Sequence, residues 1–154
     1  MSAIRTASLE WLFGYSATLQ PPEVIGPVPE GIRVNFHVTG GRAHGGVVGT
    51  LRPVGADWFT LRRDGVGELD VRATLETADG ALIYMAYRGI ADLGPKGYDE
   101  FLAGTSPTTL SLYTSPVLRT SAPAYEWLQR VHLVGVGVAD LARLEVAYDV
   151  YAVR

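Results

Sequence analysis

Two Asp-Gly dipeptides set inside alternating apolar and polar residues constrain the fold of this 154-residue chain most strongly. Asp64-Gly65 and Asp79-Gly80 tolerate the positive φ angles that tight hairpin turns require. Apolar and polar side chains alternate over residues 69–75 between the turns, and again over residues 82–87 after the second turn. The stretch Gly55–Gly89 therefore predicts a β-meander with one apolar and one mixed face.

The remainder of the chain continues the same pattern. Period-two alternation or short apolar runs predict further strands at residues 7–19, 32–39, 47–53, 57–63, 108–119, 131–138 and 144–153. We expect Pro116 to interrupt one of these strands, and the two glycines of VHLVGVGV to bend or bulge another. Residues 20–31 carry four prolines, which remove backbone donors, so this segment is predicted to be a loop or an edge-covering arm.

Helical signals are few. Residues 98–103 have i, i+3, i+4 apolar spacing before Gly104, and residues 122–129 follow a proline with one possible helical turn. With so few helices, βαβ units are excluded and an antiparallel sheet is favoured. We predict one all-β domain over residues 1–154, a closed antiparallel β-barrel of eight to ten strands with one or two short helices. A two-sheet sandwich is the alternative, because periodicity alone does not separate the two.

Composition limits the function classes. The net charge is −3 and the chain has no basic run, so we expect no nucleic-acid partner. It contains no cysteine, which excludes disulfides, thiolate metal sites and a cysteine nucleophile. No apolar run is long enough for a membrane-spanning helix, and the first 15 residues do not resemble a signal peptide. We therefore expect a cytoplasmic protein with no membrane partner.

The mixed face of the meander supplies the first catalytic candidates. Asp70 and Arg72 lie two residues apart on one strand, so they share a face, and a carboxylate beside a guanidinium stays ionised and oriented. Inside a barrel, this pair and Tyr84 could bind or polarise a substrate, and His132 could act as a general acid or base near neutral pH. The structural alternative is an exposed salt-bridge face and a packed histidine.

Other residues could line or serve a lumen. The aromatic candidates for substrate binding are Trp58, Tyr87, Tyr113 and Trp127, which could equally fill the core. If the first and last strands pair, Glu10, Glu145 and Asp149 could meet inside, where burial raises a carboxyl pKa. If these carboxylates face solvent instead, they only keep the outer surface soluble. The three histidines lack metal-ligand spacing, and no dinucleotide, P-loop or serine-elbow motif occurs. We therefore expect no metal and no cofactor.

An ordered set of short motifs carries a family resemblance over about residues 8–153. The set comprises Gly31-Ile32-Arg33, Thr39-Gly40-Gly41, Gly55-Ala56-Asp57-Trp58, Arg62, Asp64-Gly65, Leu69-Asp70-Val71-Arg72, Asp79-Gly80, Ile83-Tyr84, Tyr87-x-Gly89, Tyr125-x-Trp127-Leu128 and Val134-Gly135-Val136-Gly137. In these motifs the chain resembles domain of unknown function family 3237. The resemblance implies a closed antiparallel barrel and a homo-oligomer. The family name assigns no general activity. The chain departs from the family at Leu118-Arg119-Thr120, where relatives often carry an aromatic residue, an acidic residue and threonine.

Two functions of different class follow. In the first, the barrel holds an aromatic or apolar small molecule and acts on it as a cofactor-independent lyase, isomerase or cyclase. In the second, it is a non-catalytic ligand-binding or scaffold protein in which the same groups serve structure. The orientation of Asp70 and Arg72 separates the two, because outward-facing side chains would remove them from any lumen chemistry.

Overall fold

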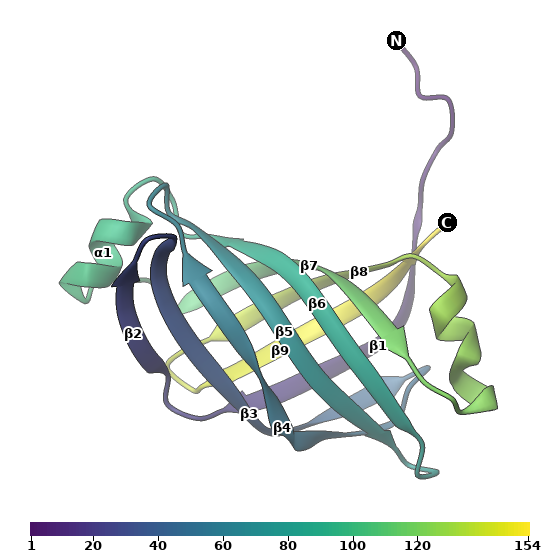
Figure 1. Cartoon of the computed structure of the whole chain (residues 1–154). Helices are drawn as coiled ribbons and strands as arrows, with labels where there is room; N and C mark the ends of the chain where they lie inside the picture. Colours follow the sequence, from purple (N-terminus) through teal and green to yellow (C-terminus); the bar gives the residue numbers. More distant parts are fainter.

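The computed structural model describes residues 1–154 and shows a closed antiparallel β-barrel of eight strands with one extra strand at its edge (Figure 1). The strands are β1 Leu9–Leu19, β2 Glu23–Val28, β3 Gly31–Gly45, β4 Gly49–Leu61, β5 Val66–Thr77, β6 Leu82–Asp92, β7 Thr109–Arg119, β8 Leu133–Asp140 and β9 Glu145–Val153. Neighbouring strands follow the order β1-β9-β8-β7-β6-β5-β4-β3, and β1 pairs again with β3 to close the ring. The predicted barrel is confirmed, and the sandwich alternative is not what the chain forms.

Two short helices complete the fold. The α-helix α1, Gly97–Ala103, ends at Gly104 in the left-handed conformation, and the 3₁₀ helix η1 spans Pro123–Arg130. Both helices lie where the sequence predicted them. Neither of them is long and apolar enough to cross a lipid bilayer.

Strand β4 differs from its prediction. The segments 47–53 and 57–63, expected as two strands, form one strand interrupted by a register shift between Leu51 and Gly55. Gly55 has a φ of +98°, and a Cβ there would collide with the carbonyl oxygen of Arg72 on β5. The glycine therefore marks a bulge within a strand, where the pattern had suggested a boundary.

The proline-rich segment also differs. Of the two alternatives for residues 20–31, the loop is wrong, because Glu23–Val28 pairs with β3 as strand β2. The segment does lie at the edge of the sheet, as the alternative of an edge-covering arm expected. The strand has only β3 as a neighbour and shifts register between Val24 and Gly26, so Pro27 sits where a missing donor is tolerated. The prolines restricted this segment to an edge and did not prevent pairing.

Two further expectations about irregular strands are wrong. Strand β7 continues through Pro116, which pairs opposite Tyr87. Strand β8 keeps an unbroken register with β7 and β9 through both of its glycines. Gly135 and Gly137 are buried, facing the barrel interior, and a Cβ at Gly137 would meet the ring of Tyr148 and the carbonyl oxygen of Ala147. The glycines make room for an aromatic ring on the next strand.

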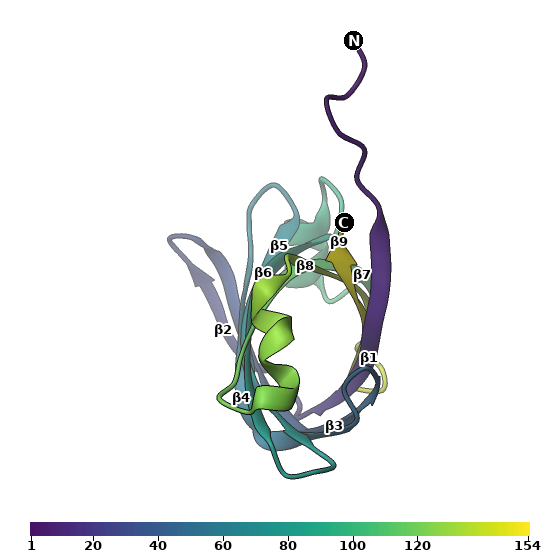
Figure 2. The same ribbon diagram turned by 90° about the vertical axis from the view of Figure 1, so that its right-hand side faces the viewer.

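The two helices lie at opposite ends of the barrel (Figures 1 and 2). At the η1 end, large hydrophobic side chains are buried in the interior, and η1 contributes Leu128, which is almost fully buried. The phenol of Tyr125 donates a hydrogen bond of 3.0 Å to Asp79 in the β5–β6 turn and so ties η1 to that turn. The core at this end consists of Phe13, Val47, Leu75, Ile83, Met85, Leu118 and Leu128.

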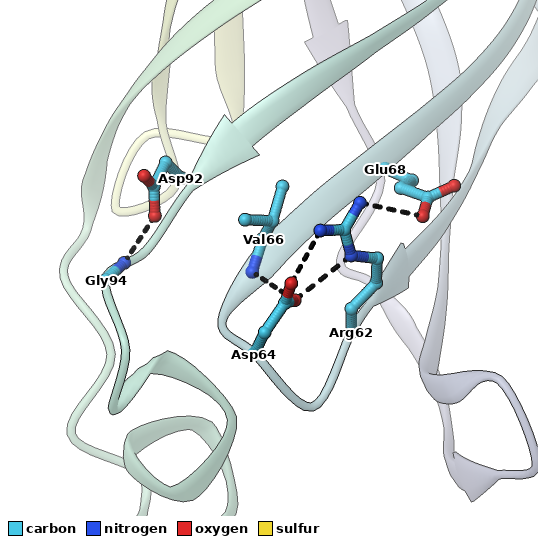
Figure 3. Close-up of polar contacts among 6 residues, drawn as sticks. All are labelled: Arg62, Asp64, Val66, Glu68, Asp92 and Gly94. Atoms are coloured by element: carbon cyan, nitrogen blue, oxygen red, sulfur yellow. Dashed lines mark hydrogen bonds and ion pairs between the residues drawn. The ribbon is translucent and has the colours of Figure 1, made fainter.

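At the other end, α1 packs beside the β4–β5 turn (Figure 3). The Arg62 guanidinium donates hydrogen bonds of 3.0 and 2.6 Å to the Asp64 carboxylate. The same carboxylate accepts a hydrogen bond from the backbone amide of Val66. Gly65 has a φ of +88°, and a Cβ there would collide with the backbone of Gly94 just before α1. Asp64 and Gly65 therefore form a turn that the segment leading into α1 approaches closely.

Candidate functional site

The barrel encloses an apolar cavity at the α1 end. It has a volume of about 90 Å³, and 19 of its 22 lining residues are hydrophobic. All eight strands of the ring, together with α1 and the segment before β7, contribute to its wall. Because inward side chains alternate with outward ones on every strand, the wall follows directly from the period-two pattern of the sequence. The volume and the apolar wall of this cavity are compatible with a compact, mainly apolar ligand.

Asp57 is the one ionisable acid in the cavity wall. It lies on β4 opposite Phe36 of β3 and Val71 of β5, both of which face inward. Its Oδ1 accepts a hydrogen bond of 3.0 Å from the backbone amide of Asp70. The inward face of β4 thus carries a carboxyl group among apolar side chains, held in place by the neighbouring strand.

The environment of Asp57 brings the pKa of its carboxyl close to neutral pH. Burial in the apolar lumen raises the pKa of the Asp57 carboxyl to about 7, opposed by the hydrogen bond from the Asp70 amide and assisted by the charge of Asp70. Desolvation is the main cause, because a carboxylate loses more hydration than a neutral carboxylic acid. A group with a pKa near 7 can both accept and release a proton at physiological pH.

Three buried tyrosines form an aromatic cluster, of which Tyr87 and Tyr148 line the cavity together with Asp57. The ring of Tyr148 stacks on Tyr15 at a centroid distance of 5.1 Å and meets Tyr87 edge-on at 5.4 Å. Burial raises the pKa of each phenol well above its usual value, and the charge of Asp57 adds to the effect at Tyr87 and Tyr148. The phenols of Tyr87 and Tyr148 therefore remain neutral in the same cavity wall as the Asp57 carboxyl.

The polar face of the meander points away from this cavity. Asp70 and Arg72 lie on the outer surface of β5, joined by an ion pair of 2.8 Å, and the Arg72 side chain is 47% exposed. Tyr84 is exposed on the outer face of β6. The hydrogen bond to Asp70, followed by the nearby Tyr84, raises the pKa of the Arg72 guanidinium. The placement of Asp70, Arg72 and Tyr84 inside the lumen is therefore wrong, and with it the form of the enzyme hypothesis that depended on them.

The other candidate residues lie either in the lumen or on the outer surface. Tyr87 lines the cavity, as a substrate-binding residue should. Trp58, Tyr113 and Trp127 are exposed, with Trp58 against His37 on the outer surface and Trp127 on η1 at the filled end. His132 is exposed just before β8. Of the sequence candidates, the structure brings only Tyr87 to the lumen.

The carboxylates of the terminal strands also lie outside. Strands β1 and β9 pair, as the hypothesis required. Glu10, however, receives a contact of 2.8 Å from Arg154, Asp149 accepts a hydrogen bond of 2.8 Å from the Trp11 indole, and Glu145 lies 3.4 Å from Arg143. The two strands therefore pair, and of the two alternatives for these carboxylates the solvent-facing one is observed.

Asp57 was not among the sequence candidates, although a signal for it exists. Residues 57, 59 and 61 share one face of β4, and Phe59 and Leu61 are apolar. An acid in phase with two buried hydrophobic residues is unusual unless it has a partner or a function.

Comparison with known proteins places the fold in a defined group. Residues 7–153 match the family described as Protein of unknown function (DUF3237). A conserved protein of unknown function from Rhodopseudomonas palustris is 30% identical, with 97% of this chain and 99% of that chain covered and a TM-score of 0.83. A β-barrel-like protein from Acinetobacter baumannii AYE is 28% identical over the whole of both chains, with a TM-score of 0.81.

A more distant structure shares the fold. An enzyme from Penicillium herquei is 22% identical, with 100% of this chain and 99% of that chain covered and a TM-score of 0.70. At this identity, the likeness concerns the barrel architecture. The extent of the family match, together with the near-complete coverage of the relatives, shows that this chain belongs to the DUF3237 family of β-barrel proteins.

Proposed function

We propose that the chain binds a compact aromatic or apolar molecule in its lumen and transfers a proton to or from it through Asp57. The reaction class is that of a cofactor-independent lyase, isomerase or cyclase. The observation that carries the proposal is the position of Asp57, a single carboxyl with a pKa of about 7 in the wall of an otherwise apolar cavity.

The chemistry follows from the neighbouring groups. The ionised carboxylate of Asp57 can remove a proton from a bound molecule, because an apolar site gives a carboxylate base little competing hydration. The neutral phenols of Tyr87 and Tyr148 can donate hydrogen bonds to an oxygen on which negative charge develops. A carboxylate base beside phenol donors suits proton transfer next to a carbonyl or at a phenol. The distant fungal barrel described as an enzyme is compatible with catalysis on this architecture.

A model reaction tests this proposal without knowledge of the natural substrate. In 1,2-benzisoxazole, a base removes the proton on C3, the C–H electron pair forms a nitrile, and the N–O bond breaks to leave a phenolate. We expect the wild-type protein to accelerate this elimination, with a rate that rises with pH through about 7 as Asp57 ionises. Asp57→Asn should lower the rate by roughly 100-fold or more, the usual contribution of a positioned base.

The matched control is Asp99→Asn, since Asp99 is an exposed acid on α1. Its rate should equal that of the wild type. Equal rates for Asp57→Asn and the wild type would contradict the assignment of the base. If benzisoxazole binds in the lumen without acceleration, the alternative function is favoured, a non-catalytic ligand-binding protein whose apolar wall alone holds the ligand.

A further inference from the structure

A second polar atom of the cavity wall is left without a partner. The Oγ of Ser106 is shielded from solvent and has no hydrogen-bond partner in the protein. Ser106 lies in the connection between the end of α1 and the start of β7 at Thr109, and it lines the same cavity as Asp57. A buried hydroxyl without a partner costs about 1–3 kcal/mol, so native proteins rarely keep one that nothing satisfies.

The strand order separates the two polar residues around the cavity wall. Asp57 is on β4 and Ser106 leads into β7, and these strands stand three steps apart in a ring of eight. Strands so far apart in a closed barrel face each other across the lumen. The wall of the cavity is otherwise apolar apart from the tyrosine phenols.

The volume of the cavity suits a small ring. A cavity of about 90 Å³ would hold about six to nine water molecules, at roughly 10–15 Å³ for each. A substituted single ring has this bulk. Its apolar edges would contact the hydrophobic wall, while polar substituents at opposite ends would reach the two walls.

We propose that the ligand is a single-ring compound with a hydrogen-bonding group at each end, one facing Asp57 and the other bonded to Ser106 Oγ. Ser106 is then a specificity-determining residue, which selects ring compounds with a second polar end over compounds with an apolar one. This inference rests on the proposed binding function of the lumen and names its ligand class.

Two isosteric probes test the assignment. 4-Hydroxybenzyl alcohol and 4-ethylphenol differ only in whether a hydroxyl or a methyl group ends the short side chain. We expect NMR titration to show that Ser106→Ala weakens binding of 4-hydroxybenzyl alcohol by roughly two- to tenfold, the value of one net hydrogen bond. Binding of 4-ethylphenol should stay the same or tighten, because no hydrogen bond is lost. The matched control is Ser111→Ala, which removes an exposed hydroxyl on the outer face of β7.

The outcomes separate this inference from the proposed function. If both probes bind the lumen and Ser106→Ala affects them equally, Ser106 does not select the ligand, while lumen binding stands. If Ser111→Ala reproduces the selective loss, the assignment to Ser106 is likewise overturned. If neither probe shifts resonances of the lumen residues in the wild type, the proposed lumen function fails, and the ligand class with it.

Discussion

The position of one carboxyl relative to the strand pleat decides its chemistry. Asp57 and Asp70 are joined by a hydrogen bond between backbone and side chain, yet they face opposite sides of the barrel wall. Asp70 lies outside and forms its ion pair with Arg72, and Asp57 lies inside among hydrophobic residues. Because a strand alternates its side chains, a shift of one residue exchanges the two environments.

The raised pKa of Asp57 makes stability depend on pH in a defined direction. Its pKa is raised from 3.8 in the unfolded chain to about 7 in the barrel. Between these values the folded state holds a proton that the unfolded state has lost, so stability falls as pH rises from about 4 to about 7. Above pH 7, the ionised carboxylate remains buried and the loss is constant. Below pH 4, both states are protonated and the effect vanishes.

We therefore expect Asp57→Asn to stabilise the protein more at pH 8 than at pH 5. The amide keeps an acceptor for the Asp70 backbone N–H and carries no charge. Each kcal/mol gained should raise the melting temperature by roughly 2–4 °C in a chain of this size. Thermal unfolding of both proteins across this pH range measures the difference. A melting difference that does not change with pH, or one shared by Asp99→Asn, would show that Asp57 is not buried in its charged form.

At the scale of elements, the sequence predicted alternation well and irregularities poorly. The meander, the terminal strands and both helices lie where periodicity placed them. Glycine and proline were the misleading residues, because each has several structural uses. Gly55 marks a bulge inside one strand, Pro27 lies in an edge strand, and Gly137 makes room for an aromatic ring. Which use applies depends on the strand that lies next to the glycine or proline in the folded protein. A single sequence does not reveal that neighbour.

The candidate site was predicted less well than the fold, for a related reason. The alternating pattern separates the two faces of a strand, but it does not label which face is enclosed when both carry aromatic and polar residues. Tyr87 was assigned to the lumen correctly, while the Asp70–Arg72 face was not. Closure of the barrel determines which face of every strand is enclosed. Closure depends on the pairing of β1 with β3 and with β9, which a local sequence pattern does not reveal.

Strand β8 provides a test of the interpretation that its glycines make space. A Cβ at residue 137 would lie 2.6 Å from the carbonyl oxygen of Ala147 and would also collide with the Tyr148 ring. We expect Gly137→Ala to destabilise the protein by about 1–3 kcal/mol, as overpacking does, and to displace Tyr148. Chemical denaturation measures the first effect, and the aromatic resonances of Tyr148 report the second. Val138→Ala, on the exposed face of the same strand, should change neither by a comparable amount. A neutral Gly137→Ala would instead mean that the strand moves to accept the methyl group.

The whole molecule is a barrel closed at one end and hollow at the other. Large hydrophobic side chains are buried at the η1 end, while the α1 end contains the cavity and carries Phe101 in its wall. This division separates a packed region from a cavity within one barrel. The η1 end buries Phe13, Met85 and Leu118, whereas the cavity at the α1 end lacks the packing contacts that side chains would supply there.

A pair of truncations at the two ends tests this division. Leu128→Ala, at the filled end, should lower the free energy of unfolding by about 2–5 kcal/mol, the usual cost of a buried Leu-to-Ala change. It should leave the affinity for 4-ethylphenol unchanged, because Leu128 does not line the cavity. Phe101→Ala should have the opposite profile, with a smaller loss of stability, since Phe101 is only partly buried, and weaker binding of the probe. Chemical denaturation and NMR titration on both variants give the comparison. If Leu128→Ala weakened binding as much as Phe101→Ala, the two ends would form one cooperative unit, because a cavity opened at η1 would then reach the ligand through the packed core.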